Sequence, residues 1–312
     1  MEKVVRVFCF LFTFWLCLAF SSDFLKPKNN TVESGMEKTE LYGFLSEPNH
    51  TIDLAVIGDS SAGNGFSPMK LWGDYGITSY VCAEGWQTLP QGYRVFKKML
   101  DTQKPKIVLL ETDEFFQPTG IARTALYVSD LASKTVLPLY DYHNRWKDVQ
   151  AKEMMRRPHY TYHSAVKGQW RDQNVKPYNG KEYMIESREE SPLSKTVRGC
   201  FALFDEICRR SHVQLVLFTV PNTSWNYSKH NAMVSCAGKI CVPYLDLNLE
   251  RKKLGFDWKT DTRDGGTHLN DQGANKVTGY IGYYLKENYV LEDHRQDHSF
   301  DHWKEDYQKF MK

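Results

Sequence analysis

Two polar segments, far apart in the sequence, contain the residue types of a nucleophile, a base and a carboxylate. Residues 58–63 place Ser60 directly after a short apolar run, and residues 264–270, near the C-terminus, contain both Asp264 and His268. A serine hydroxyl becomes a nucleophile when a histidine within hydrogen-bond reach accepts its proton, and a carboxylate holds that histidine in the correct tautomer. The sequence therefore predicts a Ser-His-Asp site made of Ser60, His268 and Asp264.

Other interpretations of these two segments stay open. Glycine and serine after a strand often form only a turn, and a histidine before a helix can be a cap or a core residue. Asp261 is an alternative carboxylate for His268. A Ser-His pair whose ring is oriented by a backbone carbonyl would also work, at lower catalytic power. Because Ser60 and His268 are distant in sequence, the fold decides between these interpretations.

Short apolar runs alternate with amphipathic segments along the chain. The runs, typical of buried parallel strands, are residues 54–57, 77–82, 107–110, 213–220 and 242–245. Helical patterns with one apolar face cover residues 88–103, 197–210 and 271–288. This alternation predicts an α/β fold with a doubly wound parallel sheet. Sites in such sheets form at the carboxyl ends of the strands, where the loops after the first and last strands can bring Ser60 and His268 together.

Taken together, these segments resemble the SGNH/GDSL hydrolase family, whose first block is Gly-Asp-Ser after the first strand and whose last block is Asp-x-x-His before the final helix. The resemblance covers most of residues 51–290. It is closest to exported bacterial members that read His-Leu-Asn-x-x-Gly-Ala near the end, as residues 268–274 do, and residues 142–146 also look like a segment of those proteins. The resemblance implies a flavodoxin-like three-layer sandwich and hydrolysis or transfer of acyl groups. This chemistry needs no cofactor and no metal.

The resemblance also implies individual roles. Ser60 matches the nucleophile, His268 the base, and Gly85 the glycine whose N–H helps to form the oxyanion hole, with the N–H of Ser60 as a second donor. The chain departs from the family after the third strand, where an asparagine is expected and residues 111–114 read Glu-Thr-Asp-Glu. An ionised carboxylate cannot donate a hydrogen bond, so Thr112, a water or a group from the following insertion would have to replace the asparagine. Losing one such donor costs about 100- to 1000-fold in rate, which predicts poor activity on generic esters.

The N-terminus has the layout of an export signal. Lys3 and Arg6 precede an uninterrupted apolar run over residues 7–20, and polar residues follow. Residues 1–22 are therefore predicted to be a cleaved signal peptide or a membrane anchor, with the rest of the chain exported. The protein would then be anchored in the cell membrane and face outside, or be secreted. A short apolar helix that packs on the domain is the alternative.

The remaining domain boundaries follow from composition. Residues 23–50 are polar without an apolar period, which predicts a tether, and residues 51–290 form the hydrolase-like domain. Within it, residues 117–192 break the alternation of strands and helices, and we expect short helices there that form one wall of the cleft. Residues 291–312 are expected to form a helical tail. Lys plus Arg is 40 and Asp plus Glu is 38, so the net charge of +2 gives no global reason to bind nucleic acid.

Four features have two interpretations each. The Asp-His pairs at 293–294, 297–298 and 301–302 could form a surface metal site or a solvated face that packs through Phe300, Trp303 and Tyr307. Arg156 and Arg157 could contact an anionic polymer or be ordinary exposed charge. The aromatic residues of the insertion could stack on sugars or fill local core; they include Trp146, Tyr160, Tyr162 and Trp170. Cys236 and Cys241 could form a disulfide, although free thiols are expected in a domain of this size.

The sequence thus predicts an extracytoplasmic serine esterase that removes acyl groups from an envelope glycan or another small ester. One alternative is an O-acyltransferase that acts on cell-surface polysaccharide with the same residues. A second is a non-catalytic protein that binds glycan or assists envelope assembly on this fold, which the acidic residues 111–114 favour.

Overall fold

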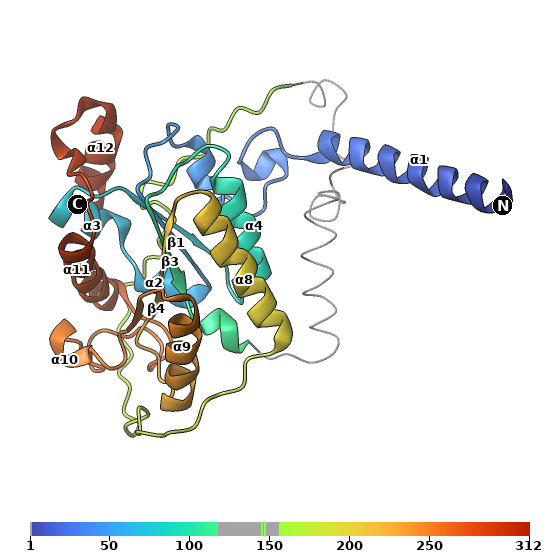
Figure 1. The fold of residues 1–312 in the computed structure, drawn as a ribbon. Coiled ribbons are helices and arrows are strands. Elements are labelled where there is room, and N and C mark those ends of the chain that lie inside the picture. Colours follow the sequence, from blue (N-terminus) through green and yellow to red (C-terminus); the bar gives the residue numbers. More distant parts are fainter. Residues whose placement is uncertain (1, 118–144, 146, 148–155) are drawn as a thin grey trace.

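The computed structural model describes residues 2–117, 145, 147 and 156–312. Its centre is a five-stranded parallel sheet with the strand order β2-β1-β3-β4-β5 (Figure 1). The strands are β1 (Leu54–Gly58), β2 (Ser79–Ala83), β3 (Ile107–Glu111), β4 (Gln214–Thr219) and β5 (Tyr244–Asp246). Each of the five predicted apolar runs overlaps one of them. This order is that of the flavodoxin-like doubly wound fold, which confirms the predicted fold class.

Helices cover both faces of the sheet because successive strand residues point to opposite sides. On one side lie α4 (Leu89–Met99), α8 (Lys195–Arg210) and α9 (Tyr227–Ile240). On the other side lie α2 (Ser60–Gly65), α3 (Pro68–Tyr75), α10 (Arg251–Leu254) and α11 (Asp271–Asn288). Figure 1 shows the two groups on opposite sides of the strands. Ala55 and Ile57 belong to the first core, and Leu54 and Val56 to the second.

The segment that follows the N-terminal helix differs from the predicted tether. It contains the short 3-10 turns η1 (Val32–Ser34) and η2 (Gly43–Ser46), and its Leu41, Phe44 and Leu45 are buried in the core beside α4. The Asn30 side chain, itself buried, donates hydrogen bonds to the backbone oxygens of Tyr42 and Tyr162. A few apolar residues in a polar segment were therefore enough to attach it to the domain.

Residues 156–192 of the insertion have no regular helix. Most of residues 118–155, which belong to the same segment in which short helices are expected, lie outside the described residues. Residues 156–192 run as an extended chain across the site edge of the sheet. The N–H of Trp170 donates to the carbonyl of Gly63, and the N–H of Lys176 donates to the carbonyl of Thr262. This chain therefore lines the two loops that carry the predicted catalytic residues. The family-like residues 142–144 and 146 lie outside the described part.

The C-terminal tail contains η5 (His294–Gln296), η6 (His298–Phe300) and α12 (Asp301–Phe310). Phe300 and Trp303 pack on Met69 and Trp72 of α3. The three histidines have three different partners, which are Asp53 for His294, Asp301 for His298 and Glu47 for His302. The tail thus packs on the domain through its aromatic residues.

A buried ion network attaches this tail to the domain. The Lys167 ammonium, fully buried, lies 2.7 Å from Glu47 and 2.8 Å from Asp306 of α12. It also lies 4.5 Å from the ring centre of Trp303. One cation thereby pairs with two carboxylates from segments that are distant in sequence.

We expect Lys167→Met to lower the free energy of unfolding by about 3 kcal/mol, because it removes the fully buried cation that Glu47 and Asp306 share. Urea unfolding of the purified chain measures this. Lys252→Met, at an exposed position of α10, is the control and should change stability by less than about 0.5 kcal/mol. Equal stabilities for the two variants would contradict the role of the network.

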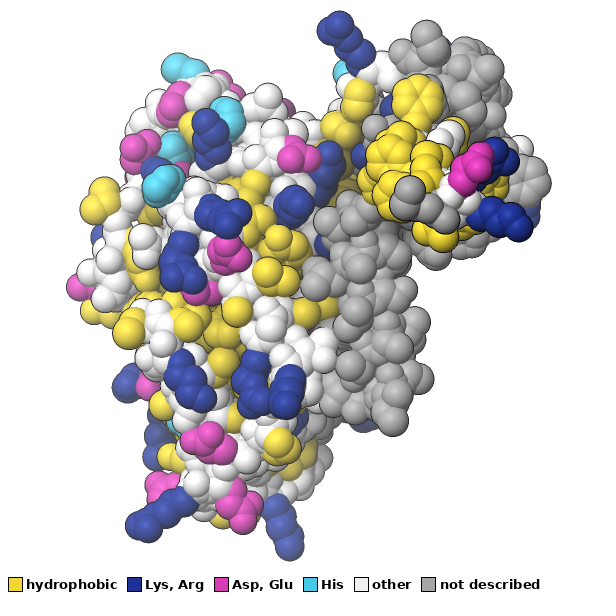
Figure 2. All heavy atoms as spheres, turned by 45° about the vertical axis from the view of Figure 1, so that its right-hand side comes forward, with side chains coloured by type: hydrophobic (Ala, Val, Ile, Leu, Met, Phe, Trp, Pro, Cys, Tyr) yellow, Lys and Arg dark blue, Asp and Glu magenta, His cyan; other side chains and the backbone are white. Residues whose placement is uncertain are grey.

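The N-terminal helix α1 (Glu2–Leu25) projects from the domain (Figure 1). Its segment Glu2–Ser22 is long and apolar enough to cross a membrane, and none of the most apolar window is buried in the protein. Figure 2 shows its hydrophobic side chains at the upper right. This helix fits a signal peptide or a membrane anchor.

Candidate active site

Ser60 begins a helix directly above the sheet. β1 ends at Gly58, and Asp59 caps α2 by accepting a hydrogen bond from the N–H of Ser61 at 2.8 Å. A side chain at residue 58 would force its neighbours to shift, because its Cβ would lie 2.6 Å from the Cβ atoms of Ala62 and Glu111. This close approach of strand, helix and neighbouring strand places the Ser60 hydroxyl at the carboxyl end of the sheet.

His268 is held by the loop that precedes α11. Thr262 and Leu269 form a short antiparallel bridge, so the chain between them makes a closed turn. Gly265 and Gly266 have φ angles of +91° and +117°, a region that side chains rarely allow. Asp264 precedes His268 by four positions, one more than in the Asp-x-x-His block of the resembled family. The two glycines accommodate this additional residue and turn the chain so that both side chains face each other.

The three predicted residues form a continuous hydrogen-bonded relay. Ser60 Oγ lies 2.8 Å from His268 Nε2, and His268 Nδ1 lies 2.5 Å from Asp264 Oδ2. The other oxygen of Asp264 accepts the backbone N–H groups of Thr267 and His268. Burial opposes ionisation of Asp264, but the hydrogen bonds from the side chain and backbone of His268 outweigh it and hold the pKa of this carboxyl below its usual value.

Asp261, the alternative carboxylate, has other partners. It is fully buried and accepts hydrogen bonds from the Lys276 ammonium and the N–H of Asp257, both at 2.7 Å. It thereby ties the loop to α11. The hydrogen bond at His268 Nδ1 is made with Asp264. The structure therefore favours Asp264 over both Asp261 and a backbone carbonyl as the group that orients the ring.

The predicted oxyanion donors lie at the same edge of the sheet. The N–H of Ser60 is at the first position of α2, where a helix leaves N–H groups without an internal partner. Gly85 is exposed in the turn after β2, and a Cβ there would meet no atom within 4 Å. Thr112 is fully buried, and its hydroxyl forms a hydrogen bond with that of Thr219 in β4. This contact disfavours the predicted role of Thr112 as a donor.

Buried carboxyl groups surround the base of the nucleophile, which the sequence analysis did not anticipate. Burial, together with the neighbouring Asp113, raises the pKa of Asp59 to about 6. Burial also raises the pKa of Asp113, and raises the pKa values of Glu111 and Glu114 well above their usual range. The signal in the sequence was the run of acids directly after a buried strand. The raised pKa values could not be predicted from that run, because the sequence does not show that all four carboxyl groups are buried close together.

Comparisons with known proteins add three structures of similar architecture. By sequence, the chain matches no protein-family model and no curated protein. By structure, it is similar to a GDSL-like lipase from Bacteroides thetaiotaomicron, with a TM-score of 0.37, 10% identity, and 75% of this chain and 87% of that chain covered. It is also similar to a candidate acylhydrolase from Bacteroides fragilis, with a TM-score of 0.38 and 11% identity, and with 77% of this chain and 90% of that chain covered. A third similar structure is a candidate lipolytic protein of the G-D-S-L family from Desulfitobacterium hafniense, with a TM-score of 0.37 and 14% identity, and with 75% of this chain and 99% of that chain covered. Likeness at this level carries no functional argument, so the proposal below rests on side-chain geometry.

The raised pKa of Asp59 gives a pH-dependent stability effect. Its pKa is higher in the folded protein than in the unfolded chain, so its contribution to stability is complete below about pH 4 and is lost as the pH rises through about 6. Asp59→Asn keeps a capping side chain and removes the charge. We expect this variant to be more stable than the parent by about 1 to 3 kcal/mol at pH 8 and by much less at pH 4. Thermal unfolding of both proteins at the two pH values measures this, and a difference that does not depend on pH would contradict it.

The two neighbouring aspartates should respond differently to substitution. Asp264→Asn removes the carboxylate that fixes the tautomer of His268, and we expect the reactivity of Ser60 to fall by about 100- to 10,000-fold. Asp261→Asn loses an ion pair with Lys276, so we expect lower stability and reactivity within a few-fold of the parent. The rate of Ser60 phosphonylation by a fluorophosphonate, measured on folded protein, distinguishes them. The reverse order would assign the orienting role to Asp261.

Proposed function

We propose that this protein is a serine esterase. The observation that carries the proposal is the relay from Asp264 through His268 to Ser60, with distances of 2.5 and 2.8 Å. These lengths permit proton transfer without rearrangement of the loop. The residues are also accessible, because the side chains of His268 and Asp264 are 21% and 34% exposed.

In the proposed mechanism, Ser60 Oγ attacks the ester carbonyl while His268 Nε2 accepts its proton. The N–H groups of Ser60 and Gly85 stabilise the oxyanion of the tetrahedral intermediate. His268 then donates the proton to the leaving alcohol, and a water molecule, deprotonated by the same nitrogen, releases the acid from Ser60. Asp264 remains ionised throughout and stabilises the imidazolium.

The surroundings of the site support an acylated carbohydrate of the cell envelope as the substrate. Within the described part of the chain, Ser60, His268 and Asp264 are each partly exposed, so an acyl group attached to a polymer can approach them. Trp86 follows Gly85 and is 72% exposed, which offers an aromatic face on which a sugar ring can stack. Retained α1 would hold the exported domain next to the membrane and its attached glycans.

Labelling with a serine-directed fluorophosphonate tests the proposal. The full chain in detergent should be labelled once, on Ser60, and Ser60→Ala should abolish the label. Ser61→Ala is a matched control in the next residue of α2, and it should retain labelling within a few-fold. Folded parent protein without any label would contradict the esterase and favour a glycan-binding protein on this fold.

A further inference from the structure

Two histidines flank the buried ion pairs of Lys167. His163 Nε2 lies 2.5 Å from Asp306 Oδ2, and His163 Nδ1 lies 3.4 Å from Glu47 Oε1. His302 Nε2 lies 3.3 Å from Oε2 of the same glutamate. Each of the two carboxylates therefore faces the Lys167 ammonium and at least one imidazole. We call these residues the tail network.

The tail network joins three segments that are distant in sequence. Glu47 directly follows η2, His163 and Lys167 belong to the extended chain of the insertion, and His302 and Asp306 belong to α12. Figure 1 shows α12 next to α3, on which it packs through its aromatic residues. The network adds a charged contact to this packing.

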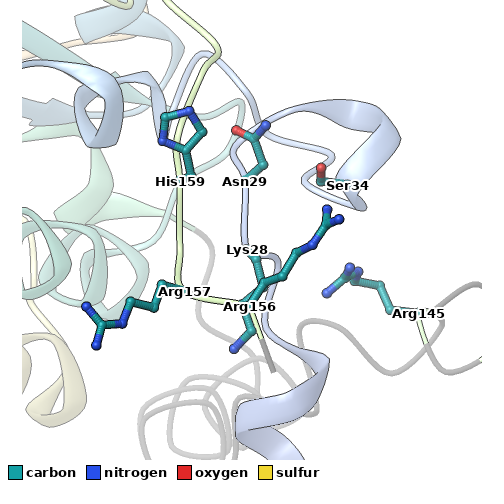
Figure 3. Close-up of a pocket in the computed structure, with 7 residues that line it drawn as sticks. All are labelled: Lys28, Asn29, Ser34, Arg145, Arg156, Arg157 and His159. Carbon is teal, nitrogen blue, oxygen red and sulfur yellow. The ribbon is translucent and has the colours of Figure 1, made fainter. Parts of the chain in front are cut away.

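The chain around His163 is fixed on both sides. Residues 159–162 are joined to residues 28–30 by backbone and side-chain hydrogen bonds, and Figure 3 shows these two segments side by side. After the histidine, the carbonyl of Lys167 accepts the N–H of Val81 in β2 at 2.9 Å. The backbone therefore holds this imidazole beside its carboxylates.

The network is also close to the site along the chain. Three residues after Lys167, the N–H of Trp170 donates to the carbonyl of Gly63 at 2.8 Å. Gly63 belongs to α2, the helix that Ser60 begins. The tail network thus fixes one end of the chain that lines the site.

Both carboxylates of the tail network are ionised near neutral pH. Burial opposes ionisation of Glu47, but hydrogen bonds from His302 and Lys167 outweigh it and hold the pKa of this carboxyl below its usual value. Burial also opposes ionisation of Asp306, and hydrogen bonds from His163 and Lys167 hold its pKa well below the usual value. The groups that change charge near neutral pH are therefore the histidines, because an imidazole titrates between about pH 5 and 8.

The charge balance of the network depends on these histidines. Two buried carboxylates share the one ammonium of Lys167, which is fully buried. Lys309 lies 3.3 Å from Asp306, but its side chain is 62% exposed, so water screens this pair. The side chains of His163 and His302 are 38% and 27% exposed, so both exchange protons with water. The charged groups that face the two imidazoles from the three segments are Glu47, Lys167, Asp306 and Lys309.

We propose that His163 and His302 make the docking of α12 depend on pH. With both imidazoles protonated, the network holds α12 on the domain. When they lose their protons, the carboxylates of Glu47 and Asp306 repel each other with too little positive charge between them, and α12 opens more often. A basic group that gains carboxylate partners on folding contributes stability at low pH, and this contribution is lost as the pH rises. The proposal does not depend on the esterase chemistry.

Hydrogen exchange of the full chain in detergent, measured by mass spectrometry, tests the proposal. Exchange of the α12 amides is compared at about pH 5.5 and about pH 8.5, on either side of the range in which imidazole titrates. Division by the intrinsic exchange rates gives a protection factor at each pH. We expect the protection of α12 in the parent to fall by about tenfold or more at the higher pH, since a difference of one pKa unit between the docked and open forms corresponds to a tenfold change.

Two variants assign this pH dependence to the network. His163→Gln/His302→Gln keeps a neutral hydrogen-bond donor at both positions, and its α12 should have low protection at both pH values, as in the parent at the higher pH. His298→Gln is the control in the same tail, because this side chain is 96% exposed, and it should keep the pH dependence of the parent. Asp59 is unchanged in all three proteins, so its own effect on stability is common to them.

Equal protection of α12 in the parent at the two pH values would overturn the proposal. A pH dependence that persists undiminished in His163→Gln/His302→Gln would also overturn it, and so would a dependence that disappears in His298→Gln. If circular dichroism shows that the double variant does not fold, the two single variants are measured instead. Each should then lose part of the dependence, and two unchanged single variants would contradict the role of the histidines.

Discussion

The site depends on one hydrogen bond, which joins the Ser60 hydroxyl to the His268 imidazole across 208 residues of sequence. β1, which leads to Ser60, lies inside the sheet, whereas β5 lies at its far edge. The chain returns from that edge because α11 packs on α2 and α3 in one shared core. The Thr278 hydroxyl of α11 also accepts the N–H of Ser67 at 2.8 Å. The hydrogen bond between Ser60 and His268 therefore depends on the packing of α11 against α2 and α3.

Electrostatics at the site work in two directions. Carboxylates near His268 favour the imidazolium that forms when Ser60 loses its proton. The same carboxylates oppose a developing oxyanion, and the chain has acids where the resembled family has an amide donor. Burial moderates this conflict, since the raised pKa values of Asp59 and Asp113 favour their neutral forms as the pH falls. A slow esterase with a restricted substrate is consistent with such a site.

Much of the fold followed from the sequence because parallel strands buried on both faces read as continuous apolar runs. Helix α11 has the predicted bounds, since Asn270 provides a clear cap by accepting the N–H groups of Gln272 and Gly273. The packing of residues 26–50 could not be predicted, because their few buried apolar side chains have no period. The carboxylate of the relay was also ambiguous from the sequence, because the choice depends on the positive φ angles of two glycines and on the other partners of Asp261. The partner of Thr112 is a residue of β4, 107 positions away, which no local pattern indicates.

The most direct measurement is a crystal structure of the protein after reaction with a fluorophosphonate. The account predicts phosphorus bonded to Ser60 Oγ, a phosphoryl oxygen about 3 Å from the N–H groups of Ser60 and Gly85, and His268 still bonded to Asp264. An adduct on another residue, or a His268 ring turned away from the adduct and from Asp264, would contradict the account.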